Sequence, residues 1–67
     1  MKPVSNYVKT GERVDFYTVT ESAARKGEIA VGYKKILDGQ FSIVTNPLKT
    51  DEVIFNEEDN LIVIAED

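Results

Sequence analysis

The chain has 67 residues and a formal net charge of −4, and it contains neither cysteine nor histidine. A chain of this length forms one small domain that hides only about 60% of its unfolded surface, so we do not expect an enclosed catalytic pocket. Without cysteine and histidine there are no disulfides, thiolate nucleophiles, imidazole acid–base groups or usual zinc sites. We therefore expect no enzyme activity, no metal and no cofactor. Because neither a signal peptide nor a long apolar segment is present, we expect a soluble chain.

The charge is distributed unevenly along the chain. Residues 1–50 carry all eight lysines and arginines together with five acids, whereas residues 51–67 carry seven acids and no base. The basic residues stand singly or in pairs, without the clustered stripe that binding to a phosphate backbone requires. We expect no nucleic-acid partner.

Residues 1–12 show no clear periodicity and include Pro3 and Gly11. This pattern predicts an N-terminal arm or linker, in which Tyr7 and Val8 are the candidates for docking or for a short strand. The domain itself is predicted to comprise residues 13–67.

Residues 15–26 have the pattern of a helix. Phe16, Val19, Ala23 and Ala24 follow i, i+3, i+7, i+8 spacing, with Asp15 as N-cap and Gly27 just past the end. An alternative remains open, because a capping box from Thr18 to Glu21 would start the helix later and leave residues 14–17 as a strand.

Two strands and a hairpin follow this helix. Residues 29–35 place Ile29, Val31 and Tyr33 on one side, and the small Ala30 and Gly32 on the other leave room for a close approach of backbone or helix.

The dipeptide Asp38-Gly39 predicts a tight turn into a second, antiparallel strand over residues 41–45. Pro47, which has no amide donor, ends the pairing at a corner. With residues 61–65 as a further strand, the expected fold is α+β: a small antiparallel sheet of three to four strands with one helix packed on one face.

The closing strand, residues 61–65, is apolar on both faces. Leu61, Val63 and Ala65 are predicted to face the core, which leaves Ile62 and Ile64 on the other face. The N-terminal arm could cover this second face; the interpretation that we favour is a second subunit or a neighbouring domain. Ile62 and Ile64 are therefore the candidate interface residues.

The acid-rich turn at residues 56–60 raises the question of a calcium site. Its acids lack the alternate spacing and glycine of an EF-hand loop, so we predict a solvated turn without metal. Gly27, Gly32 and Gly39 stand too far apart to cradle a phosphate. We expect three phenylalanines in the core, namely Phe16, Phe41 and Phe55.

Two segments carry a resemblance to a known family: AARKGEIAVGYK at residues 23–34 and NPLKTDEVIFNEEDNLIVIAED at residues 46–67. Together with the order of elements over about fifty residues, they resemble the TrkA-C domain, the C-terminal half of the RCK regulatory units of potassium channels and transporters, and in particular the Castor/Pollux-like ion-channel proteins. The family's turn reads Gly-Asp-x-Leu, whereas this chain has Glu58-Asp59-Asn60-Leu61. We therefore expect Asn56 or Asn60 to adopt the positive φ that glycine would supply.

The resemblance implies a cytoplasmic regulatory domain, a piece of a larger membrane channel or transporter, that pairs as a homodimer and couples the sensing of a ligand or ion to gating. It implies no dinucleotide site, because that site belongs to the N-terminal half of RCK units. Two alternatives stay open: a stand-alone dimerisation or small-ligand-binding module, and an accessory domain of a carrier without a sensory role.

Overall fold

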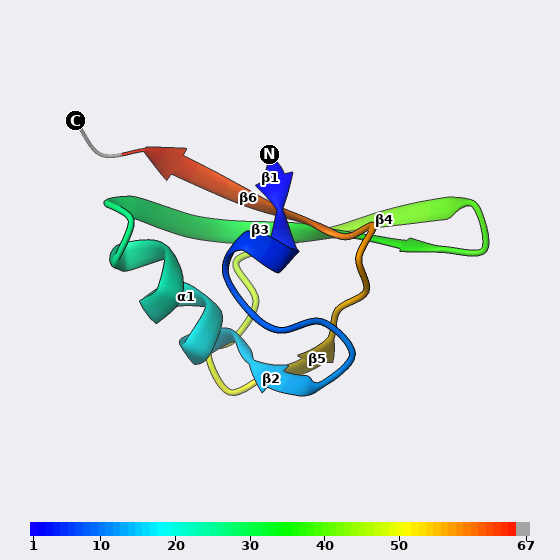
Figure 1. Ribbon diagram of the computed structural model, residues 1–67, viewed down its shortest axis with the longest axis horizontal. Helices are drawn as coiled ribbons and strands as arrows, with labels where there is room; N and C mark the ends of the chain where they lie inside the picture. Colours follow the sequence, from blue (N-terminus) through cyan, green and yellow to red (C-terminus); the bar gives the residue numbers. More distant parts are fainter. Residues whose placement is uncertain (66–67) are drawn as a thin grey trace.

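The computed structural model describes residues 1–65, which form one helix and two small antiparallel sheets. The elements are β1 (Lys2–Pro3), a 3-10 turn (Val4–Asn6), β2 (Arg13–Asp15), α1 (Phe16–Ala24), β3 (Glu28–Leu37), β4 (Gln40–Thr45), β5 (Glu52–Ile54) and β6 (Asn60–Ala65). The main sheet has the strand order β1-β6-β3-β4, and β2 pairs with β5. α1, β2 and β5 all lie on the same side of the long β3–β4 hairpin (Figure 1). The expected α+β fold is confirmed, and the β2–β5 pair is an addition to it.

The helix begins where the sequence indicates. The Asp15 carboxylate accepts hydrogen bonds from the Thr18 amide at 2.8 Å and from the Thr18 hydroxyl at 2.6 Å, so Asp15 is the N-cap. Phe16, Val19 and Ala23 are buried. The later start at Thr18 is therefore wrong, although residues 13–15 before the helix do form a strand.

The β3–β4 hairpin is confirmed together with its turn. Asp38 and Gly39 have φ of 51° and 77°, as a two-residue turn of type I′ requires. The pairing runs from Leu37 opposite Gln40 to Gly32 opposite Thr45. β6 pairs antiparallel along the other side of β3, as expected for residues 61–65.

A β-bulge interrupts β3. Ala30 pairs with Val63, but the next paired residue is Gly32, opposite Ile62, so Val31 is the extra residue. The bulge inverts the alternation of side chains, and the prediction that Ile29 and Tyr33 share a face is wrong: Tyr33 is buried and Ile29 is exposed.

The predicted close approach at Gly32 is confirmed. A Cβ atom on this residue would lie 2.2 Å from the Val44 carbonyl oxygen. The approaching group is the backbone of β4. Ala30 lies on the other face, where it packs against the core.

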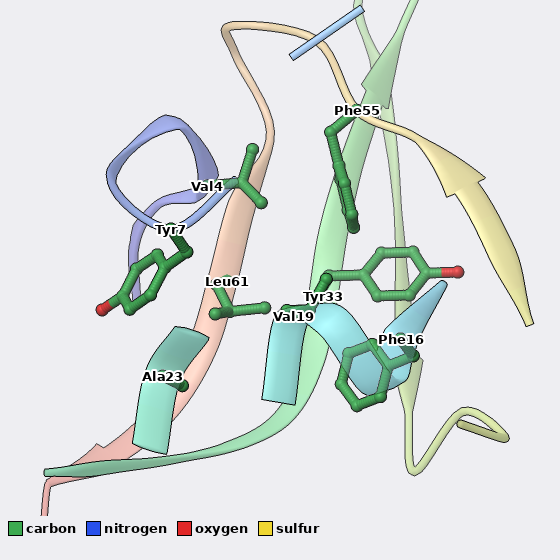
Figure 2. Close-up of a cluster of buried hydrophobic side chains, with 8 residues drawn as sticks. All are labelled: Val4, Tyr7, Phe16, Val19, Ala23, Tyr33, Phe55 and Leu61. Atoms are coloured by element: carbon green, nitrogen blue, oxygen red, sulfur yellow. The ribbon is translucent and has the colours of Figure 1, made fainter. Parts of the chain in front are cut away.

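Eight side chains form the core between α1 and the main sheet, and Figure 2 shows the Tyr33 ring between those of Phe16 and Phe55. The Tyr33 ring meets Phe55 edge to face, with centroids 5.2 Å apart, and Phe16 at a tilt, with centroids 6.2 Å apart. The complete set is Val4, Tyr7, Phe16, Val19, Ala23, Tyr33, Phe55 and Leu61. Phe16 and Phe55 are placed as predicted, whereas the prediction for Phe41 is wrong because its side chain is exposed.

The N-terminal segment, expected to be an arm or linker, is part of the packed structure. Val4 is completely buried and Tyr7 nearly so. Lys2 and Pro3 pair with Leu61 and Asn60 at the edge of β6, and the Val4 amide donates to the Asp59 carbonyl at 3.0 Å. Residue 12 is therefore not a boundary between a free arm and a separate core.

Candidate functional site: an open apolar sheet face

The face of the main sheet that lies opposite α1 is apolar over three strands. Residues directly opposite each other in an antiparallel pair share a face, and the register pairs Ile29 with Ile64, Gly32 with Ile62, and Ile36 with Phe41. Lys34 lies between Gly32 and Ile36 on this face of β3, so its partner Ile43 lies on the same face. We call this surface the open face, and its apolar members are Ile29, Ile36, Phe41, Ile43, Ile62 and Ile64.

These side chains are largely accessible to solvent. The exposed fraction is 46% for Ile29, 52% for Ile43, 57% for Ile64 and 63% for Phe41, and Ile36 and Ile62 are half-buried. Large apolar side chains that gather on one surface mark a site of interaction, whereas scattered single ones do not. The open face is the strongest candidate for a functional surface within residues 1–65.

Lys34 is the one charged residue that the register places on the open face in β3, β4 and β6. Its ammonium lies 4.6 Å from the centroid of the Phe41 ring. This is the geometry of a cation–π contact, in which the lysine stem also covers apolar surface. The face is therefore apolar, with a single positive charge held against it.

The candidate residues Ile62 and Ile64 both lie on the open face, as predicted. Sequence reasoning missed the other members for two reasons. Phe41 was assigned to the core, and the bulge at Val31 concealed the side to which Ile29 points. Phe41 and Ile43 alternate with Ser42, and this alternation beside a confidently assigned turn is the signal that could have identified them.

The N-terminal segment does not cover the open face. Its buried residues, Val4 and Tyr7, pack into the core on the α1 side, and Ile64 remains exposed. The alternative in which the arm covers Ile62 and Ile64 is therefore wrong. On the core face of β6, Leu61 is buried and Val63 packs against the core as predicted, but Ala65 is exposed, so that part of the prediction is also wrong.

The acid-rich turn is only partly solvated. Glu57 and Glu58 are exposed, but Asp59 is 1% exposed. The Asp59 carboxylate accepts hydrogen bonds, each at 2.9 Å, from the amides of Ile36 and Asn56 and from the Lys35 ammonium. The prediction of a solvated turn is wrong for this residue, because its carboxylate ties the turn to β3.

These contacts determine the ionisation of Asp59. Burial by itself raises the pKa of the carboxyl, but the Asn56 amide, the Lys35 ammonium and the Ile36 amide lower it by more, so its pKa lies below the ordinary value. The carboxylate is thus committed to structure.

No three carboxylates within residues 1–65 gather into a group that could hold a metal ion. Positive φ among the non-glycine residues of the same range occurs at Asp38 and Asn46. The expectation that Asn56 or Asn60 would adopt it is wrong.

A second buried carboxylate anchors the N-terminal segment. Glu28 accepts a hydrogen bond from the Tyr7 hydroxyl at 2.6 Å and forms an ion pair with Lys2. The hydrogen bonds from Lys2 and then Tyr7 lower the pKa of Glu28. Burial and the hydrogen bond to Glu28 raise the pKa of Tyr7 to about 12. This cluster ties the N-terminal segment to β3.

No family model matches the chain. Along residues 1–65, none of the helical structure is long and apolar enough to cross a membrane.

Proposed function

We propose that this chain is a cytoplasmic regulatory and dimerisation domain of a cation channel or transporter, potassium being the expected ion, and that it pairs with a second copy through the open face. The observation that carries the pairing is the set of six apolar side chains on a sheet face that no helix covers within the described residues. The channel or transporter role is supported by the resemblance of residues 23–34 and 46–67 to the TrkA-C domain.

The open face suits a partner of the same kind. Two sheets that pack face to face interdigitate their side chains across a layer about 10 Å thick. Isoleucine and phenylalanine supply the apolar area, and the two Lys34 side chains can remain at the rim with their ammonium groups in water. A two-fold pair of such faces is self-complementary, as a homodimer requires.

Pairing through a sheet also suits a regulatory role. A change in the relative orientation of two rigid sheets moves everything attached to them, so a ligand or ion that favours one orientation shifts the population of the states of the attached pore.

The test of pairing is Ile64→Glu measured by sedimentation velocity. In the dimer the new carboxylate would be buried against apolar side chains, which costs several kcal/mol for each copy, and about 3 kcal/mol already weakens association more than a hundredfold. We expect a monomer with the circular dichroism spectrum of the wild type.

The matched control is Ile54→Glu. Ile54 is similarly exposed but lies on β5 in the other sheet, so we expect wild-type association. As a folding control, Leu61→Asp should unfold the domain, because it places a charge at a fully buried position. A wild-type monomer at high concentration, or an Ile64→Glu dimer as tight as wild type, would remove this interface.

The channel or transporter role has a separate test in the parent gene. We expect it to encode membrane helices and a glycine-rich dinucleotide motif upstream of this domain. A parent without membrane helices would contradict that role and would favour the stand-alone module.

A further inference from the structure

A cavity of about 440 Å³ lies between the N-terminal segment and α1. Tyr7, Val8 and Lys9 form one side, Tyr17 and Arg25 belong to or follow α1 on the other, and Val14 of β2 also contributes. Cavities that hold small organic molecules have volumes of about 300–1,000 Å³. This cavity is large enough for a small metabolite and too small for a helix or a long strand.

The polar groups of the cavity differ in how they are engaged. Glu21 accepts a hydrogen bond from the Tyr17 hydroxyl at 2.6 Å, and the Ser22 hydroxyl donates to the Tyr7 carbonyl at 2.6 Å. Thr18 donates its hydroxyl hydrogen to Asp15. These hydroxyl groups are occupied by neighbours within the protein.

The two cations of the cavity are available to a ligand. Lys9 lies 3.5 Å from the Glu12 carboxylate, but both side chains are exposed, and a pair of this kind contributes little. Among residues 1–65, no carboxylate lies within ion-pair distance of the Arg25 guanidinium. A guanidinium has a planar fork of donors that matches the oxygens of a carboxylate or phosphate.

We propose that this cavity binds a small organic anion, whose carboxylate or phosphate pairs with Arg25, assisted by Lys9, while its apolar part rests on Val8, Val14 and the Tyr17 ring. Because Arg25 follows the carbonyl end of α1, the negative end of the helix dipole disfavours an anion there. Because the helix end does not attract the anion, binding depends on the charge and the hydrogen bonds of the Arg25 guanidinium.

The proposal goes beyond the self-association described above and does not require it. The cavity is lined by the N-terminal segment, β2 and α1. Figure 1 shows α1 and β2 on one side of the main sheet, and the register places the open face on the other side. A bound anion would bridge residues 7–9 to α1, in parallel with the hydrogen bond from Ser22 to the Tyr7 carbonyl. Binding should therefore hold the N-terminal segment more firmly against the helix.

The test is a titration of the ¹⁵N-labelled chain, followed by amide chemical shifts, with four probes: phenyl phosphate, benzoate, inorganic phosphate and phenol. We expect saturable shifts at Val8, Lys9, Tyr17 and Arg25 with phenyl phosphate or benzoate, at dissociation constants of about 1 mM, as suits fragments of this size. The preferred member of this pair identifies the anionic group. Inorganic phosphate and phenol each lack half of the recognised chemistry and should bind at least about tenfold more weakly.

Arg25→Gln should abolish these shifts, and Arg13→Gln is the matched control, because Arg13 does not line the cavity. Ile64→Glu should bind the probes like the wild type, which separates this proposal from the one on pairing. Equal binding by Arg25→Gln and the wild type, shifts confined to the open face, or no saturable shift with either aromatic anion up to about 10 mM would overturn the inference.

Discussion

We expect Asp59→Ala, which removes a single carboxylate, to destabilise the domain strongly. It leaves the amides of Ile36 and Asn56 without their acceptor, and it removes the carboxylate that pairs with Lys35. Lys35 keeps one partner, because its ammonium also donates to the Ile54 carbonyl at 2.6 Å. The main cost therefore arises from the two backbone amides in a largely buried site.

The magnitude follows from these contacts. Leaving one buried amide without its acceptor costs about 1–3 kcal/mol, so the two amides together give an expected loss of about 3 kcal/mol. A domain of this length has a free energy of unfolding of roughly 3–10 kcal/mol, at about 0.05–0.15 kcal/mol per residue. The variant should lose a large part of its stability, and at the lower limit about half of the molecules should be unfolded.

The assay is urea unfolding followed by circular dichroism at pH 7. Glu58→Ala is the control, since Glu58 lies in the same turn with an exposed side chain, and its midpoint should stay at the wild-type value. Asp59→Asn keeps one oxygen acceptor and should fall between the two. A loss below about 1 kcal/mol for Asp59→Ala, the value of one ordinary hydrogen bond, would refute the assigned role.

The pH dependence of stability provides a second measurement on the same residue. Because the pKa of Asp59 is lower in the folded state than its ordinary 3.8, its contribution is complete above that value and is lost as the pH falls below 3.8 and through the folded pKa. Asp59→Asn should remove this part of the acid sensitivity.

Three further outcomes are expected. Gly32→Ala should cost about 1–3 kcal/mol in urea unfolding, because the new methyl group meets the β4 backbone; an unchanged midpoint would contradict the close approach. In an absorbance titration at 295 nm, Tyr7 should ionise near pH 12, later than its ordinary 10.0, so that its stabilising effect is lost as the pH rises between these values; Tyr7→Phe should remove this late step. Calcium should leave the amide shifts of residues 57–59 unchanged, and saturable micromolar shifts there would indicate a metal site.

The elements that could be predicted are those determined by local sequence. Asp15 caps the helix through a residue three positions away, and the Asp38-Gly39 turn depends on the φ preferences of two adjacent residues. Such features require no knowledge of distant partners. The helix and the β3–β4 hairpin were therefore predicted correctly.

The rest depends on pairing between distant residues. The bulge at Val31 arises from the register of β3 against β6, and it determines which isoleucines become exposed. Asp59 belongs to a run of acids that is typical of a solvated turn. Its carboxylate accepts hydrogen bonds from Lys35 and Ile36 of β3, which are more than twenty residues earlier in the sequence. The one sequence signal for its role was the resemblance of Asp59 and Leu61 to the Gly-Asp-x-Leu turn of the TrkA-C domain.

The pairing of β1 with β6 has a consequence for synthesis in the cell. Lys2 lies opposite Leu61, and the Val4 amide donates to the Asp59 carbonyl, so segments that leave the ribosome more than fifty residues apart contact each other. At about 5–20 residues per second, Val4 stays without its partners for about 3–11 seconds. The domain therefore cannot complete its fold until β6 has left the ribosome.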